Sequence, residues 1–204
     1  MRMISGMIRP TAGNILVDGH DVVLRHQDIK PLIGYMPQRF GLYADLTVEE
    51  NIDFFLDIFG IPRPLRMKRK EKYLGFSNLL PFKDRPAGNL SGGMKQKLGL
   101  ACVLVHEPRL LILDEPTNGV DPVSRREFWD ILISMKNDGL TILVSTAYLD
   151  EGEKCDVLAL MHAGAILEQN TPAAMRGKYL SLEEAIIARI KETDKELTRD
   201  AFQY

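Results

Sequence analysis

The sequence predicts an α/β fold in which a mainly parallel sheet is interrupted by a mainly helical insertion. Two short apolar runs, over 110–113 and 141–144, have no polar face, as expected for strands of a parallel sheet that are buried on both sides. A segment with helical apolar spacing, 122–137, separates them and gives the strand–helix–strand order of α/β proteins. The insertion is predicted at about residues 40–105, where helical patterns dominate.

The chain before the insertion carries signals for short elements. Residues 1–8 have helical apolar spacing without an N-cap before them, so we interpret them as the tail of a helix. Two short strands are expected next, over 14–17 before the turn at 18–19 and over 33–36 before Pro37.

Within the insertion, a helix is predicted over 47–59 behind Thr47 as its N-cap, and another over 93–105. The basic stretch between them, 62–72, is broken by prolines. We interpret this stretch as a solvated surface segment rather than as a nucleic-acid site.

After the second apolar strand, a hairpin and a last helix are expected. The hairpin covers 157–167 and turns at 162–164. Ser181 with Glu184 forms a capping-box pattern for a helix that begins at residue 182 and ends near 190. The polar tail, from 191 onward, is expected to fray.

The composition is that of a globular domain and disfavours several classes of protein. The chain has 204 residues, of which 45% are hydrophobic and 26% charged, and its net charge of −2 argues against nucleic-acid binding by bulk electrostatics. Its two cysteines and four histidines have neither disulfide-framework nor metal-ligand spacing. No apolar run approaches the roughly 20 residues that span a bilayer, so a membrane role is expected to come through a partner.

Two motifs carry the candidate chemistry. Ser91, Gly92 and Gly93 stand directly before a predicted helix, where glycines allow close approach of a phosphate and free N–H groups face it. Seventeen residues after Gly93 begins the strand that ends in Asp114 and Glu115. Carboxylates at such a strand end are typical of a Mg²⁺ anchor and a water-activating base. Each motif by itself is ambiguous, since it also fits a plain loop or a strand stop.

Together, at this spacing, the motifs resemble those of ABC-type ATPases, and the resemblance covers nearly the whole chain. Residues 90–97 resemble the signature motif, with Met94 where glutamine is more usual. Residues 110–114 are similar to the Walker B strand, and 118–121 to the D-loop. Gln38, ahead of the helical insertion, is similar to the Q-loop glutamine.

The resemblance implies a P-loop NTPase-like fold, ATP and Mg²⁺ as cofactors, and roles for three residues. Asp114 would orient Mg²⁺, with Gln38 as a second metal-site residue. Glu115 would polarise the attacking water. Gln38 would also take part in catalysis, by sensing the γ-phosphate and relaying its presence to the membrane partner.

The same resemblance implies that Ser91, Gly92, Gly93 and Asp121 bind nucleotide. The signature residues would cap the ATP of a second nucleotide-binding domain, paired head to tail in a homo- or heterodimer. Residues 40–51 are similar to bacterial exporters of the drug or polysaccharide type, so a membrane permease is the other implied partner, and nucleic acid is not. The implied location is cytoplasmic, peripheral on the cytoplasmic face of the inner (plasma) membrane.

As a domain plan, we expect one partial ABC ATPase domain over residues 1–204. The Q-loop, helical subdomain and signature motif would occupy about 40–105, and the Walker B strand, D-loop and switch region 106–170. A C-terminal helical tail would occupy 171–204.

Two departures from the family pattern qualify this expectation. No GxxxxGK(S/T) phosphate loop occurs in the sequence. We therefore expect the chain to begin after that loop and to lack the N-terminal strands. The strand leading into the loop would lie beside 110–113, which would otherwise have an exposed edge.

The second departure is Ala147, which stands where the family has its switch histidine and cannot donate a hydrogen bond. Loss of such a donor removes roughly 3–4 kcal/mol of transition-state stabilisation, so the chain's own hydrolysis is expected to be impaired.

Three hypotheses stay open from the sequence. The leading hypothesis is the ATP-binding subunit of an ABC transporter, which couples ATP binding and hydrolysis to export through a membrane permease. In this hypothesis the chain is a fragment or degenerate copy, whose signature motif completes a partner's ATP site. Alternatively, it is a conventional ATPase whose true N-terminus is missing from this sequence. The third hypothesis is a non-transport ABC-type ATPase or an inert scaffold.

Overall fold

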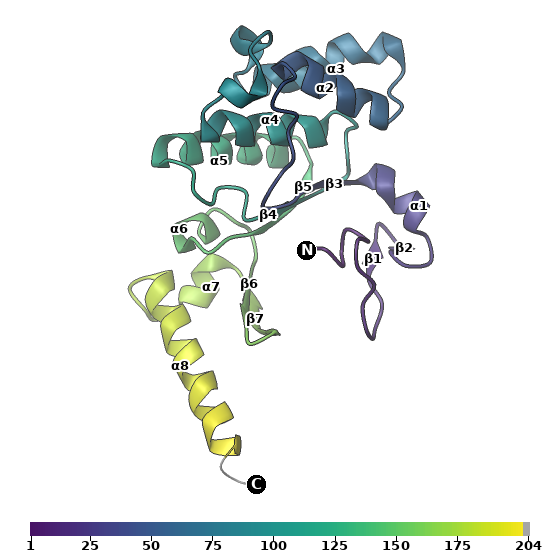
Figure 1. Cartoon of the computed structure of the whole chain (residues 1–204). Helices are drawn as coiled ribbons and strands as arrows, with labels where there is room; N and C mark the ends of the chain where they lie inside the picture. The colour runs from purple at the N-terminus through teal and green to yellow at the C-terminus, as the bar shows by residue number, and fades with distance from the viewer. Residues whose placement is uncertain (202–204) are drawn as a thin grey trace. The chain divides into compact units, whose positions relative to one another are not determined.

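The computed structural model describes the backbone of residues 1–201 and the side chains of residues 1–194. The chain forms two compact units, Met1–Ser145 (unit 1) and Thr146–Tyr204 (unit 2), each with its own elements (Figure 1). The expected plan of one partial domain with three regions stays a prediction.

Unit 1 is built on a three-stranded parallel sheet. Its strands are β3 (Ile33–Met36), β4 (Leu110–Asp114) and β5 (Thr141–Ser145), in the order β3-β4-β5. The register pairs Met36 with Leu113 and Asp114 with Ser145, so all three strands end at the same edge of the sheet. This confirms the predicted α/β fold with a parallel sheet.

Two expectations about strand exposure are wrong. We expected the strand over 110–113 to have an exposed edge, yet β4 is paired on both sides. We expected a buried strand over 141–144, yet β5 is only half-buried and Leu143 is 36% exposed. Among the described strands, β5 pairs with β4 alone. An apolar run indicates that a strand lacks a polar face, but it does not identify the strand's neighbours.

The helical insertion lies between β3 and β4, as predicted, and consists mainly of α2 (Val48–Ile58), α3 (Arg63–Phe76) and α4 (Gly92–Leu104). The short 3-10 turns Leu80–Phe82 and Ala87–Asn89 join α3 to α4. Thr47 and Glu50 form a complete capping box at the start of α2. The helix α5 (Pro122–Asn137) connects β4 to β5 and lies beside α4 (Figure 1).

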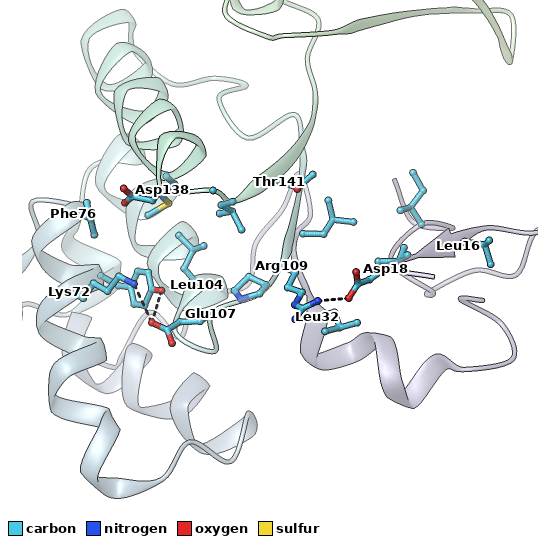
Figure 2. Close-up of a pocket in the computed structure, with 18 residues that line it drawn as sticks. Leu16, Asp18, Leu32, Lys72, Phe76, Leu104, Glu107, Arg109, Asp138 and Thr141 are labelled. Atoms are coloured by element: carbon cyan, nitrogen blue, oxygen red, sulfur yellow. Dashed lines mark hydrogen bonds and ion pairs between the residues drawn. The ribbon is translucent and has the colours of Figure 1, made fainter. Parts of the chain in front are cut away.

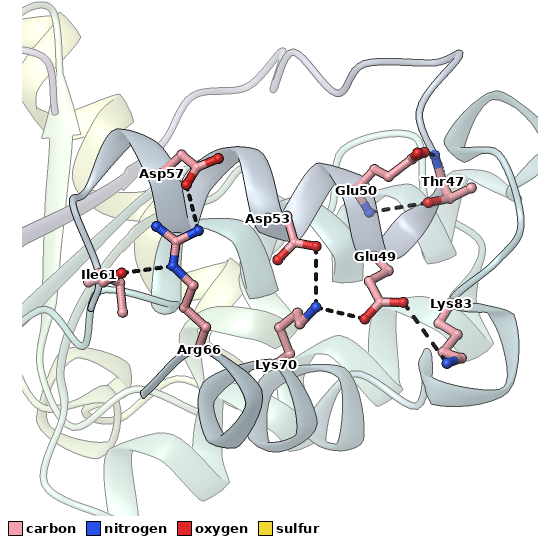
Figure 3. A network of polar contacts seen from close by, with 9 residues as sticks. All are labelled: Thr47, Glu49, Glu50, Asp53, Asp57, Ile61, Arg66, Lys70 and Lys83. Carbon is pink, nitrogen blue, oxygen red and sulfur yellow. Dashed lines mark hydrogen bonds and ion pairs between the residues drawn. The ribbon is translucent and has the colours of Figure 1, made fainter. Parts of the chain in front are cut away.

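The basic segment 62–72 forms most of α3, which the sequence interpretation did not identify. Pro62 is the N-cap and Pro64 lies in the first turn, where the missing N–H has no intrahelical acceptor to lose. Lys70 then reaches back to α2, where it donates to Glu49 at 2.7 Å and to Asp53 at 3.2 Å (Figure 3). The segment is therefore tied to the neighbouring helix by ion pairs.

Residues 1–8 form turns, so the expected helical tail is wrong in extent. Gly6 has a φ of +75°, and the Met7 N–H donates to the Arg2 carbonyl at 3.0 Å. The Gly6 N–H donates to the Met3 carbonyl at 3.1 Å. These are the bonds that close a helix C-terminus, but the left-handed glycine ends the helical turn after a single i→i−4 bond.

The expected strand over 14–17 is shorter than predicted and forms a hairpin from β1 (Leu16–Val17) and β2 (His20–Asp21). The short helix α1 (His26–Ile29) and a 3-10 turn (Lys30–Leu32) lead into β3. A small core joins this region to the sheet and consists of Val17, Val22, Ile29, Ile33 and Ile112.

Unit 2 contains α6 (Leu149–Gly152), the predicted hairpin of β6 (Leu158–His162) and β7 (Ala165–Asn170), then α7 (Pro172–Arg176) and α8 (Leu182–Ala201). Met175, Leu182 and Ile186 form its core. The Ser181 hydroxyl accepts from the Glu184 N–H at 3.1 Å, as the capping pattern predicts. The last helix continues well past residue 190, and the final part of the tail expected to fray, 202–204, lies outside the described residues.

No helix in the described part of the chain combines the length and the apolar character needed to cross a bilayer.

Candidate functional site

The carboxyl ends of the three parallel strands bring together one of the predicted carboxylates and two hydroxyl groups. Asp114 is the last residue of β4, and its Oδ1 accepts a hydrogen bond from the Ser145 hydroxyl at 2.7 Å. The Tyr35 hydroxyl, from β3, reaches Oδ2 of the same carboxylate at 3.5 Å. Burial, and next the charge of Asp114, raise the pKa of Tyr35, so this hydroxyl remains a donor at neutral pH.

Glu115 leaves the strand with a left-handed backbone, at a φ of +47°. Its N–H donates both to the Ser145 carbonyl, at 3.1 Å, and to the Ser145 hydroxyl oxygen, at 3.0 Å. Its carboxylate oxygen Oε2 accepts from Gln38 Nε2 at 2.8 Å and from Asn118 Nδ2 at 3.2 Å. The structure thus joins Gln38 directly to Glu115, although 77 positions separate them in the chain.

The predicted nucleotide-binding residues form a second group, where two helices begin. Ser91 is the N-cap of α4, and its hydroxyl accepts from the Met94 N–H at 3.3 Å. Asp121 is the N-cap of α5 and accepts from the N–H groups of Val123, at 3.1 Å, and Ser124, at 2.9 Å. The hydrogen bonds from Ser124, above all, lower the pKa of Asp121.

Gly93 lies where these two helix starts meet. A Cβ at this position would lie 2.3 Å from Ser124 Oγ and 3.7 Å from Asp121 Oδ2. Gly92 differs, because a Cβ there would meet nothing within 4 Å. Gly93 is therefore required for packing, whereas Gly92 leaves its side of the helix start open. Further along, the buried Lys97 of α4 pairs with Glu127 of α5 at 2.7 Å.

A cavity of about 720 Å³ lies at the opposite end of the sheet (Figure 2). It is lined by Leu32, Arg109 and Thr141, which stand at the amino ends of the three strands. Four of its charged groups form two ion pairs, Arg109 with Asp18 at 2.7 Å and Lys72 with Glu107 at 3.2 Å. None of the residues predicted to carry chemistry lines this cavity.

Three residues of the site were missed as site residues by the sequence analysis: Tyr35, Asn118 and Ser145. Asn118 follows the carboxylates closely, and the other two lie on strands whose carboxyl ends meet at Asp114. The available signal was the strand end itself, since parallel strands end at a common edge. Ala147 follows β5 after one residue and is exposed.

A protein-family model described as "ABC transporter" matches residues 1–118, which is more than half of the chain. The chain belongs to the ABC transporter family. This confirms the resemblance that the motifs indicate, and a protein of this family is expected to bind ATP.

Two curated relatives and a solved structure agree with this membership. The probable multidrug ABC transporter ATP-binding protein YbhF of Escherichia coli (strain K12) is 47% identical over 175 residues, which cover 86% of this chain and 30% of that protein. The Nod factor export ATP-binding protein I of Burkholderia orbicola is 36% identical over 176 residues, covering 86% of this chain and 58% of that protein.

The solved structure is cbiO1 from Clostridium perfringens, described as part of the ABC transporter complex cbiONQ. It aligns with a TM-score of 0.79 at 29% identity, covering 87% of this chain and 73% of that one. The ABC ATPase fold is thereby established for this chain. The chain spans less than a third of the length of YbhF.

Proposed function

We propose that this chain is part of the ATP-binding subunit of an ABC transporter, with Gln38, Asp114 and Glu115 as its hydrolytic site. One observation carries the proposal. The Gln38 amide donates to the Glu115 carboxylate at 2.8 Å, at the strand end that also presents Asp114. An amide and two carboxylates at the carboxyl edge of a parallel sheet suit the positioning of a metal ion and a water molecule beside a phosphate.

In this proposal Glu115 is the catalytic base. Gln38 and Asn118 both donate to its Oε2, which leaves Oε1 to accept from the attacking water. Gln38 holds Glu115 and senses the γ-phosphate, so its amide is shared between the base and the nucleotide.

The donor set fits magnesium. Asp114 offers a carboxylate and Gln38 an amide oxygen, which are the hard oxygen ligands that Mg²⁺ prefers. Mg²⁺ usually takes only one or two carboxylates, and phosphates and water complete its coordination. When bound, the ion would neutralise charge that develops on the phosphates.

Ser91, Gly92, Gly93 and Asp121 are proposed to bind the nucleotide held by a second nucleotide-binding domain. The open surface at Gly92 and the free N–H groups at the start of α4 support an anion site. The proposed partners are that second domain, in a homo- or heterodimer, and a membrane permease at the cytoplasmic face of the inner membrane. The names of the relatives favour export of a small molecule, such as a drug.

Mutation of the assembled transporter tests the proposal. Glu115→Gln is expected to abolish ATP turnover while ATP remains trapped, because the base is lost and the binding groups stay. Asp130→Asn, at an exposed carboxylate of α5, is the matched control and should leave turnover unchanged. Turnover that persists in Glu115→Gln would overturn the assignment.

A second candidate function is that the chain only lends its signature motif to the ATP of a partner domain. The open Gly92 surface favours it. Gly92→Asp would then stop turnover by the partner, whereas Glu115→Gln would not. Unchanged turnover in Gly92→Asp would exclude this candidate.

A further inference from the structure

Ser145, the last residue of β5, contacts both carboxylate residues of the proposed site. The sheet register sets it directly opposite Asp114. Its hydroxyl donates to Asp114 Oδ1 at 2.7 Å, and the same oxygen accepts from the Glu115 N–H at 3.0 Å. One hydroxyl group therefore holds the side chain of one carboxylate residue and the backbone of the next.

The chemistry of these groups fixes the direction of each hydrogen bond. An ionised carboxylate only accepts, so the Ser145 proton must point to Asp114, and a lone pair is left for the Glu115 N–H. The result is a chain of donors from the Glu115 N–H through the Ser145 hydroxyl to Asp114. Bonds in such a chain polarise one another, which strengthens each of them.

The backbone conformation of Glu115 gives these two linked hydrogen bonds a specific role. A non-glycine residue at a φ of +47° costs about 1–3 kcal/mol and persists only where its surroundings hold it. Both acceptors of the Glu115 N–H belong to Ser145, namely its carbonyl at 3.1 Å and its hydroxyl at 3.0 Å. Ser145 is thus placed to hold the left-handed turn that directs the Glu115 side chain toward Gln38.

We propose that Ser145 is a positioning residue of this site, which sets the Asp114 carboxylate and the Glu115 carboxylate relative to one another. The inference rests on the proposed hydrolytic function. It adds a residue that acts through Asp114 and Glu115, with no contact to the nucleotide of its own.

The test compares two variants of nearly equal shape in the assembled transporter. Ser145→Thr keeps the hydroxyl and suits a strand, whereas Ser145→Val replaces it with a methyl group. We expect Ser145→Val to lower kcat about 10- to 100-fold, the range expected from a small misplacement of catalytic groups. KM should stay within about twofold. Ser145→Thr should stay within about threefold of the wild type in both constants.

Thr141→Val supplies the matched control, because Thr141 begins the same strand at the other end of the sheet. It should leave kcat and KM unchanged. A readout without turnover comes from the backbone chemical shifts of Glu115 in the isotope-labelled full chain. These shifts should move away from left-handed values in Ser145→Val and stay in Ser145→Thr.

The outcomes separate this inference from the proposed function. If Glu115→Gln abolishes turnover while Ser145→Val and Ser145→Thr behave alike, Ser145 is not a positioning residue and the function stands. If Glu115→Gln leaves turnover intact, the proposed function fails. Unchanged Glu115 shifts in Ser145→Val would overturn the inference without reference to ATP.

Discussion

The side chain of Ser124 occupies the space where residue 93 would carry a Cβ, which would lie 2.3 Å from Ser124 Oγ. The first turn of α4 and the first turn of α5 therefore pack directly against each other at Gly93 and Ser124. It also means that two adjacent glycines of one motif have different tasks. Gly93 allows the helices to meet, and Gly92 faces open space.

Gly93→Ala is expected to lower the free energy of unfolding by about 1–3 kcal/mol, as overpacking of a close contact does. Gly92→Ala is the control and should change it by less than about 1 kcal/mol. Urea denaturation followed by circular dichroism measures both. The double variant Gly93→Ala with Ser124→Gly should recover most of the loss, and equal effects of the two alanines would contradict the packing argument.

Lys70→Met is expected to lower the free energy of unfolding by about 1 kcal/mol, the upper range for partly exposed ion pairs. The variant leaves Glu49 and Asp53 facing each other without their shared cation (Figure 3). Lys68→Met, at an exposed lysine of the same helix, should have little effect. Thermal unfolding in low and high salt measures the difference, which should shrink as salt rises.

The same ion pair predicts a pH dependence. The hydrogen bond from Lys70 lowers the pKa of Glu49 below its ordinary value of 4.5. A depressed carboxyl pKa contributes stability that is present above pH 4.5 and is lost as the pH falls through the lowered value. The difference in stability between wild type and Lys70→Met should therefore narrow in acid.

His106 is expected to make the protein less stable below pH 6.5. Its ring stacks on Phe59 at 3.8 Å, and its Nε2 contacts the Ile33 carbonyl at 3.1 Å. Because a carbonyl only accepts, Nε2 carries the proton and the buried Nδ1 does not. Burial, and also the charge of Arg69, lowers the pKa of His106 below its ordinary value of 6.5.

The sign follows from proton binding. Below pH 6.5 the unfolded chain binds more protons at this residue than the folded chain does. The free energy of unfolding therefore decreases as the pH decreases, by at most about 1.4 kcal/mol per pH unit. Urea denaturation at a series of pH values below 6.5 should show a smaller slope of stability against pH in His106→Phe than in the wild type. An unchanged slope in His106→Phe would refute the assignment.

Ala147→His is expected to raise ATP turnover of the assembled transporter, by roughly 100-fold if the imidazole reaches the phosphate. The expectation rests on the place of Ala147 in a segment that otherwise resembles the family's switch region. Ala147→Leu supplies a side chain without a donor and should give no gain. Equal turnover in all three proteins would indicate that position 147 has no part in hydrolysis.

The chain of 204 residues by itself is expected to bind ATP too weakly for detection at micromolar nucleotide. Its sequence contains no GxxxxGK(S/T), the loop whose backbone N–H groups and lysine hold the phosphates of ATP. Isothermal titration calorimetry with Mg²⁺ and ATP measures this directly. Stoichiometric binding would contradict the expectation.

The residues proposed for hydrolysis could be located from the sequence because each ends a strand or follows one closely. Asp114 and Glu115 follow an apolar run whose burial is evident, and Gln38 follows the next recognisable strand along the sheet. Ser145 also ends a strand, but serine is common both at strand ends and in loops, so its presence there does not indicate a site. Only the strand register, which pairs Ser145 with Asp114, identifies it as part of the site.

Strand order and helix boundaries were less accessible from the sequence. The period of an apolar run carries no information on neighbours, so β4 was expected at an edge that β5 occupies. Two prolines concealed α3, because they break a helix in its interior and are tolerated at its start. The stacking of His106 on Phe59 joins residues 47 positions apart, so no local sequence pattern predicts it.

The left-handed turn at Glu115 has a consequence for how this site tolerates change. Glycine adopts that backbone without strain, so Glu115→Gly removes the carboxylate and relaxes the turn in one step. Loss of the proposed base by this substitution should therefore cost the fold little, whereas a β-branched residue would lose the carboxylate and also strain the left-handed backbone. Copies of this domain that lose catalysis can therefore stay folded and remain available as binding partners.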